Sequence, residues 1–112
     1  MGGGNAMNPQ FKKGVLNLCV LALLVTRDMY GYELVQAISS KINISEGAVY
    51  PLLRRLTAEG YFTTYMVEST EGPARKYYQI TEIGKEQLRI QKMEWQQFYE
   101  AVNSLMNEGE QS

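Results

Sequence analysis

The 112-residue sequence contains no histidine and a single cysteine, Cys19. Without histidine, the chain lacks the imidazole base that activates the nucleophile in many enzymes. The shortage of both residue types also argues against zinc and thiolate metal sites, which need several such ligands. Paired carboxylates in a recognisable catalytic motif are missing too. We therefore expect no enzymatic activity, no metal and no cofactor, and we interpret Cys19 as a small buried hydrophobic residue.

Long hydrophobic runs are also missing. The apolar stretch VLNLCVLALLV, residues 15–25, is shorter than the roughly 18 residues that span a bilayer. The cleavage pattern of small residues that follows the core of a signal peptide is not found after it. We therefore expect a cytoplasmic protein with no membrane partner. We interpret residues 1–6 as a remnant of recombinant expression, with the native start at Met7.

A strong excess of charge of either sign is lacking as well, since 11 lysines and arginines accompany 12 aspartates and glutamates. This balance argues against a generally adhesive nucleic-acid binder. The charges are unevenly spread, with four basic and two acidic residues in 1–44, four of each in 45–78, and three basic and six acidic in 79–112. An anionic partner should therefore meet the first two-thirds of the chain and avoid its tail.

Proline is scarce, and one of the three prolines lies inside a predicted helix, SEGAVYPLLRRL at residues 45–56. Ser45 is predicted to be the N-cap of this helix. Pro51 is predicted to kink the helix or loosen its first turn, because proline removes a backbone donor. The apolar residues have the spacing of one buried helical stripe: Val49, Leu52, Leu53 and Leu56.

The opposite face of this helix is small and positively charged. It is predicted to present Gly47, Pro51, Arg54 and Ala58, with Tyr50 and Arg55 on its flanks. Little side chain keeps another surface away from the backbone here, so the face suits close contact with a polyanion. The alternative is a surface helix whose arginines are merely solvated.

The rest of the pattern predicts further helices and one hairpin. Asp28 is predicted to cap the second helix, whose inward stripe is Tyr30, Leu34, Ala37 and Ile38. Gly60 is predicted to end the third helix, and Thr81 to cap the last. The predicted elements are helices at 11–25, 29–40, 45–59 and 82 to about 107, and strands at 61–68 and 75–80 joined by a turn at 69–74.

The last predicted helix carries apolar residues along its whole length: Leu88, Trp95, Phe98, Tyr99, Val102, Leu105 and Met106. Several of them recur every seven residues, which is typical of a helix packed along a partner helix. Residues 85–107 alone would extend about 34 Å, too far for a small core to cover. We therefore expect a second subunit to cover this helix, joined by the apolar first helix.

Three helices followed by a hairpin predict a winged helix-turn-helix fold, mainly α with a small β-hairpin (α+β). The DNA-binding domain is predicted at residues 7–81, and a dimerisation helix with an acidic tail at 82–112. In this fold the third helix enters the major groove and the hairpin reaches neighbouring phosphates. The basic pairs 54–55 and 75–76 fall on these two elements. The tyrosines that follow, Tyr77 and Tyr78, either donate hydroxyls to phosphates or stabilise the hairpin as an aromatic pair.

Four parts of the chain resemble the PadR family of bacterial transcriptional regulators, in its compact subfamily: MYGYEL (29–34), GAVYPLLRRLTAEGYF (47–62), GPARKYYQITEIG (72–84) and Trp95. The resemblance extends over about residues 11–106. It implies a homodimeric repressor whose last helix crosses to the partner subunit. The DNA-contacting residues that it implies are Tyr30 and Tyr32, then Ser45, Gly47, Ala48, Tyr50, Pro51 and Arg54, and on the wing Arg75, Lys76 and Tyr77. The first basic pair adds Arg55 to this predicted set.

Trp95 has two interpretations at this stage. Large aromatic residues often anchor subunit interfaces, so Trp95 could have a purely structural part in the dimer. The resemblance implies instead that two symmetry-related tryptophans flank a pore for flat aromatic compounds. Apart from the resemblance, the neighbouring Glu94 could attract a cation. The predicted effector or dimer interface comprises Trp95 with Leu88, Phe98, Tyr99 and Val102.

The resulting hypothesis is a homodimeric repressor that binds a roughly palindromic site on double-stranded DNA. A small, planar effector at the dimer interface would release it. The alternative is a winged-helix protein–protein interaction module without DNA binding, which the near-neutral net charge allows.

Overall fold

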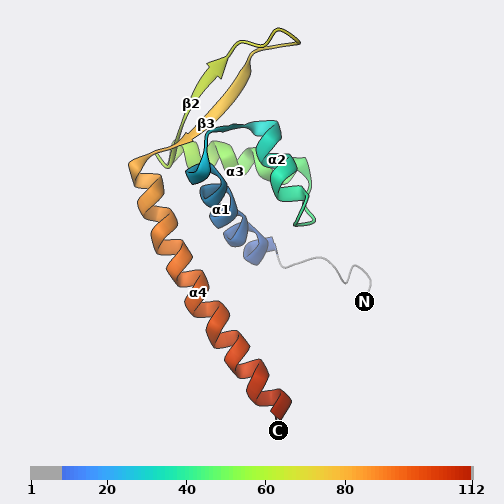
Figure 1. The fold of residues 1–112 in the computed structure, drawn as a ribbon, viewed down its shortest axis with the longest axis vertical. Helices are drawn as coiled ribbons and strands as arrows, with labels where there is room; N and C mark the ends of the chain where they lie inside the picture. The colour runs from blue at the N-terminus through green and yellow to red at the C-terminus, as the bar shows by residue number, and fades with distance from the viewer. Residues whose placement is uncertain (1–8, 112) are drawn as a thin grey trace.

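The computed structural model describes residues 9–111, which form four helices and three strands (Figure 1). The elements are α1 (Pro9–Thr26), β1 (Met29–Tyr30), α2 (Gly31–Ser39), α3 (Glu46–Ala58), β2 (Phe62–Val67), β3 (Arg75–Ile80) and α4 (Glu82–Gln111). This order confirms the predicted winged helix-turn-helix fold with a long last helix. The predicted expression remnant at 1–6 and the start at Met7 lie outside the described residues. Within residues 9–111, no helix is both long enough and apolar enough to cross a membrane.

The hydrophobic core lies where α1, α2 and α3 meet the base of the hairpin. The predicted stripe of α3 is buried, and Val49 and Leu53 are completely enclosed. Each large apolar side chain that is removed from water stabilises the fold by about 1.5–3 kcal/mol. The rest of the core comprises Leu16, Val20, Leu21 and Leu24 of α1, Met29 of β1, Leu34, Val35 and Ile38 of α2, and Phe62 and Tyr78 of the hairpin. Because the whole apolar stripe of α3 packs inward, the opposite face of that helix is turned outward.

The start of the second helix differs from the prediction. Met29 and Tyr30 form a short strand that pairs with β3, and α2 begins only at Gly31. Asp28 is therefore not the cap of α2. Its carboxylate accepts hydrogen bonds from the hairpin instead, and the backbone N–H of Tyr30 donates to Glu33 Oε1 at 3.1 Å. An aspartate before a helical pattern ordinarily indicates a cap, but here distant donors compete for it.

The three strands form an antiparallel sheet in the order β1-β3-β2, so that β3 is central. The register between β2 and β3 runs from Phe62 opposite Ile80 to Val67 opposite Arg75. This pairing places Glu68 in the connecting loop, which makes the loop one residue longer than predicted. Alternate residues of a strand point to opposite faces of the sheet. Phe62 and Tyr78 face the core, and the next residue along each strand faces away from it.

Both ends of α3 have identifiable causes. Ser45 occupies the N-cap position with an extended backbone, but in the described structure its side chain makes no capping hydrogen bond. The N–H of Ala48 donates to the Ser45 carbonyl at 3.1 Å, a 3₁₀-type bond in the first turn, and the helix continues through Pro51. At the C-terminus, Gly60 has φ +88°. The N–H groups of Gly60 and Tyr61 donate to the carbonyls of Thr57 and Leu56, which is a Schellman motif.

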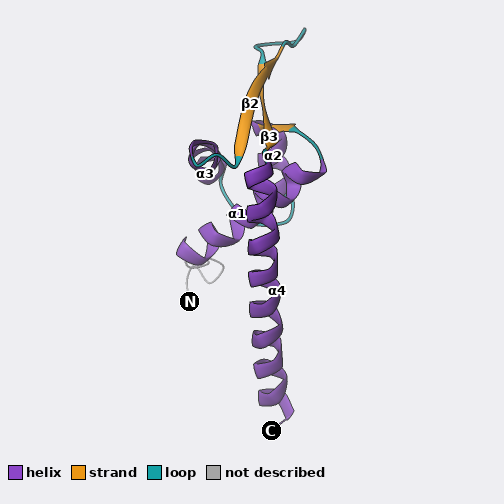
Figure 2. Cartoon of the chain, turned by 90° about the vertical axis from the view of Figure 1, so that its left-hand side faces the viewer, coloured by secondary structure: helices purple, strands orange, loops and turns teal. Residues whose placement is uncertain are grey.

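The last helix, α4, begins at the predicted cap and extends beyond the rest of the molecule. The Oγ1 of Thr81 accepts a hydrogen bond from the N–H of Gly84 at 3.0 Å. The helix has 30 residues and is therefore about 45 Å long, longer than predicted because it continues to Gln111. Its first turns pack along α1, and its second half extends away from the core, at the opposite end of the molecule from the hairpin (Figures 1 and 2).

Candidate nucleic-acid interface

The outward face of α3 matches the predicted one. Gly47, Pro51, Arg54 and Ala58 are exposed, while Tyr50 and Arg55 are half-buried at its edges. Ser45 and Ala48 are also exposed near the start of the helix. Most of these side chains are short, so the backbone of α3 is accessible to a large partner such as a DNA duplex.

A groove brings together residues that lie far apart in the sequence. It has a volume of about 420 Å³ and lies between the start of α2, the side of α3 and strand β3. Its lining consists of Tyr30, Gly31, Tyr32, Tyr50, Arg54, Lys76 and Tyr78. Five of these residues belong to the predicted DNA-contacting set. Two cations among tyrosine hydroxyls provide the donors that commonly bind phosphate oxygens.

Gly31 is a member of this groove that the sequence reasoning missed. A Cβ atom at this position would lie 2.9 Å from Cε1 of Tyr50, closer than van der Waals contact allows. The glycine therefore lets the ring of Tyr50 lie against the first turn of α2. The feature of the sequence that could have identified Gly31 is a glycine between Tyr30 and Tyr32 at the start of a helix.

Tyr78 forms the buried side of the groove. Burial raises the pKa of its phenol, the nearby Tyr50 raises it further, and the Arg54 guanidinium partly opposes this. Its ring meets Phe62 edge-on, with the ring centroids 6.5 Å apart. Lys76 Nζ lies 6.0 Å from the centroid of the Tyr78 ring. The Tyr78 ring therefore lies between Phe62 of the core and the ammonium group of Lys76.

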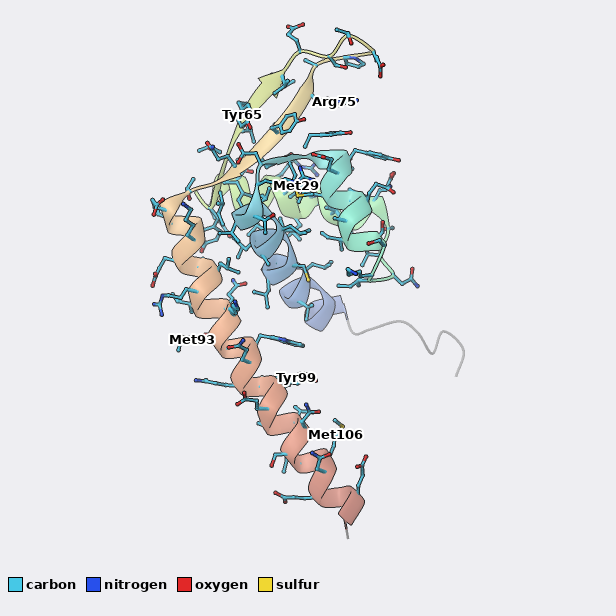
Figure 3. All side chains as sticks on the ribbon, viewed as in Figure 1. Met29, Tyr65, Arg75, Met93, Tyr99 and Met106 are labelled. Atoms are coloured by element: carbon cyan, nitrogen blue, oxygen red, sulfur yellow. The ribbon has the colours of Figure 1, made fainter. Side chains whose placement is uncertain are left out.

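The second basic pair is divided between the two faces of the hairpin. Arg75 Cζ lies 4.6 Å from the centroid of the Tyr30 ring, whereas Lys76 lies over Tyr78 and lines the groove. Tyr77 is on the Arg75 face, where its ring contacts the rings of Tyr65 and Tyr30. Figure 3 shows Tyr65 and Arg75 on the hairpin, outside the helical part of the molecule. Because adjacent strand residues point in opposite directions, Arg75 and Tyr77 do not join Lys76 in the groove.

Arg55 also has a position that the prediction did not anticipate. Its Nη2 donates to Asn17 Oδ1 of α1 at 3.0 Å, and its Nη1 lies 3.6 Å from Glu59 Oε1. These contacts hold α3 against α1. Arg54 and Arg55 are thus separated as well, and Arg54 is the member of the pair that lines the groove.

Trp95 lies between two hollows on α4. One, of about 490 Å³, lies between α1 and α4 and includes Leu18, Glu94, Trp95 and Phe98 in its lining. The other, of about 320 Å³, is lined by Trp95, Gln96, Tyr99 and Glu100. The centroids of the Trp95 and Tyr99 rings are 6.1 Å apart.

The other predicted members of the α4 set have different surroundings. Leu88 packs against the core of the same chain, because it lies on the first turns of α4, beside α1. Val102 is half-buried, whereas Phe98 and Tyr99 are exposed. In the described part of the chain, no cluster of histidine, cysteine or acidic side chains could hold a metal ion.

Comparison with known proteins identifies relatives of this chain. Residues 20–90 match the model of the transcriptional regulator PadR-like family. An uncharacterized protein from Lysinibacillus sphaericus is 34% identical over 98 residues, which are 84% of this chain and 90% of that protein.

Solved structures are similar over most of their length. A PadR-like transcriptional regulator from Bacillus cereus is 39% identical with a TM-score of 0.78, covering 87% of this chain and 96% of that one. A PadR-like transcription factor from Bacteroides fragilis is 35% identical with a TM-score of 0.73, covering 86% and 94%.

Proposed function

The chain belongs to the PadR-like family of transcriptional regulators, and from this premise we propose that it is a dimeric repressor of transcription. Each subunit inserts α3 into the major groove of a double-stranded operator. The groove residues bind the adjacent phosphates. A small planar molecule that binds near Trp95 releases the dimer from DNA.

One observation carries the DNA-binding part of this proposal. Arg54 and Lys76 line the same groove, although they come from different elements and lie 22 positions apart in the sequence. Around them are four tyrosines, and beside them is the exposed small-residue face of α3. Two converging cations with hydroxyl donors suit a phosphate backbone, and the small residues allow the helix to approach base edges closely.

The dimer is supported by uncovered apolar surface on α1 and α4. The outward side of α1 carries the half-buried or exposed residues Val15, Leu18, Cys19, Ala22 and Val25. On α4, Phe98 is 56% and Leu105 68% exposed, next to Trp95, Tyr99 and Met106. Contiguous apolar surface of this kind is unusual for a monomer and typical of subunit interfaces. A second copy of the chain would cover it by packing its own α4 along these two helices.

The position of Trp95 supports the effector part of the proposal. A flat aromatic compound could stack on the indole in either hollow, and a carboxylate, Glu94 or Glu100, lines each of them. These carboxylates favour a cationic compound. Since the same helix forms the proposed dimer interface, a bound compound would change the spacing of the two recognition helices.

Retardation of DNA fragments tests the proposal. Duplexes would be selected from fragments of the source genome, and the affinity of the purified protein for them measured over about 50–200 mM salt. A dimer that neutralises about 6–8 phosphates should give a log–log slope of about −5 to −7. Adding planar aromatic cations to the same assay should release the DNA.

The variants for this experiment follow from the groove. Replacing Arg54 and Lys76 together by alanine removes four cations from the dimer and should reduce the magnitude of the slope by about 3–4. Lys92→Ala, an exposed site on α4 away from the groove, is the matched control and should retain the wild-type slope. Full affinity in the double variant would contradict the proposed interface. An absence of retardation at low salt, with a co-purifying protein partner, would favour the interaction module instead.

A further inference from the structure

The hairpin has little support from the core beyond its base. Phe62 and Tyr78 are buried, but residues 63–68 and 70–76 are nearly all exposed, with several of their side chains far from any helix (Figure 3). An isolated two-stranded hairpin is only marginally stable in water. The hairpin of β2 and β3 is the wing of this fold. The angle between the wing and the helices therefore depends on contacts outside the core.

Asp28 provides such contacts from the link between α1 and β1. Its Oδ2 accepts a hydrogen bond from Tyr65 Oη at 2.6 Å and another from Gln79 Nε2 at 3.2 Å. Tyr65 belongs to β2 and Gln79 to β3, so one carboxylate oxygen holds both strands of the wing. These partners are 37 and 51 positions away from Asp28 in the sequence.

We call the two hydrogen bonds to Asp28 the Asp28 bracket. A row of aromatic rings extends from Tyr65 across the same face of the sheet. The Tyr65 and Tyr77 rings are stacked, with centroids 5.6 Å apart and planes inclined by 15°. Tyr77 in turn contacts Tyr30 at 5.5 Å, and Arg75 lies over the Tyr30 ring. Tyr30 is the N-cap residue of α2. The row therefore joins the exposed part of the wing to the helix that borders the groove.

From this geometry we propose that Asp28 is a positioning residue for DNA binding: it holds the wing at the angle that keeps Lys76 beside Arg54. This inference rests on the proposed function. Asp28 itself does not contact DNA, because a carboxylate is repelled by phosphate. It acts through Tyr65 and Gln79. The hydrogen bond to Asp28 is also the main cause that raises the pKa of the Tyr65 phenol.

Asp28→Ala and Asp28→Asn form a matched pair that tests the proposal. Both variants remove the same negative charge, but asparagine keeps a carbonyl oxygen that can accept from Tyr65. Asp28→Ala removes two hydrogen bonds and should weaken binding to a selected duplex of about 30 base pairs by about tenfold, because one ordinary hydrogen bond contributes a factor of about three. Asp28→Asn should stay within about twofold of the wild type. If charge were the only effect, both variants would bind DNA more tightly.

The salt dependence separates positioning from a general loss of stability. A displaced wing withdraws Lys76 from the phosphates, so Asp28→Ala should reduce the magnitude of the slope by about 0.9 per subunit. On a Lys76→Ala background, Asp28→Ala should then cause little further loss. A lower fraction of folded protein would leave the slope unchanged. Equal affinities of the Ala and Asn variants, or an unchanged slope in Asp28→Ala, would overturn the proposal.

Amide hydrogen exchange without DNA makes the test independent of the proposed function. Tyr65→Phe keeps the stacked ring and removes only the hydroxyl donor. In Tyr65→Phe and Asp28→Ala alike, the amides of β2 and β3 should exchange faster, while those of α3 stay as in the wild type. If the wing amides exchange at the wild-type rate in these variants, Asp28 does not position the wing, even if the protein binds DNA. If they exchange faster but the wild-type protein binds no duplex, Asp28 does position the wing and the proposed function is wrong.

Discussion

Arg75 and Lys76 are neighbours in the chain, yet their cationic groups lie over different tyrosine rings on opposite faces of the hairpin. Arg54 and Arg55 are divided in the same way, since Arg54 lines the groove while Arg55 binds Asn17. In each pair, one cation lines the groove, and the other makes its contacts outside it. Two of the four cations in these pairs, Arg54 and Lys76, therefore line the groove.

A substitution at Gly31 tests how much a single residue of the groove matters. In Gly31→Ala the new Cβ must displace the Tyr50 ring, although alanine is intrinsically favoured over glycine in helices by about 1 kcal/mol. We expect the free energy of unfolding to change by less than about 1 kcal/mol, but the affinity for DNA to fall. Denaturant unfolding and DNA retardation, measured on the same samples, check these two expectations. Gly14→Ala is the control, because nothing lies within 4 Å of the position that its added methyl group would occupy, and it should retain DNA affinity.

At the scale of secondary-structure elements, the C-terminal end of α3 determines the direction in which the chain enters strand β2. Gly60 adopts a left-handed backbone, and the Schellman bonds from Gly60 and Tyr61 close the helix. The carbonyls of Gly60 and Tyr61 then accept hydrogen bonds from Thr81 Oγ1 at 2.7 and 3.1 Å. One threonine therefore ties the end of α3 to the start of α4, and the hairpin lies between these two points.

Gly60→Ala should destabilise the protein by about 1–2 kcal/mol, because a side chain in the left-handed region clashes with the backbone. The free energy of unfolding from denaturant titration measures this effect. Gly72→Ala is a suitable control: Gly72 lies in the hairpin loop, without a left-handed φ and with open space around its Cβ position. Equal stabilities of the two variants would contradict the role assigned to Gly60.

At the scale of the whole molecule, α4 is longer than the part that the rest of the chain covers. Its first turns pack against α1, but its second half carries exposed apolar side chains that extend away from the core. Leaving apolar surface in water forgoes about 25 cal/mol for each Å² that a partner could cover. The proposed second subunit would remove this surface from water, and the same contact would fix the distance between the two recognition helices.

Phe98→Glu should convert the proposed dimer into monomers, since it places a charge within the apolar interface. Sedimentation equilibrium over a range of concentrations measures the mass directly. Gln97→Glu adds the same charge at the adjacent exposed position and should leave the dimer intact. A wild-type protein that sediments as a monomer at all concentrations would contradict the assembly. Phe98→Glu should also weaken DNA binding, because a single subunit reads only one half of a palindromic site.

The sequence by itself determined the features that depend on a few neighbouring residues. The stripe of α3, the stop at Gly60, the cap at Thr81 and the strand at 75–80 were all predicted, because helical and strand periods and caps are local properties of the backbone. The outward face of α3, with Arg54 and the small residues, follows from the same periodicity. The resemblance to the PadR family was confirmed, because residues 20–90 match the model of that family.

Only the tertiary structure decided which distant groups meet. It assigned Asp28 to the hairpin instead of to α2, added the strand β1, and placed only one residue of each basic pair in the groove. Asn17 and Arg55 are 38 positions apart, and Asp28 and Gln79 are 51 apart. Partners at such separations are chosen by the packing of whole elements. A carboxylate or a guanidinium forms hydrogen bonds with the polar groups that tertiary packing brings within about 3 Å of it. The residues next to it in the sequence do not indicate which groups these are.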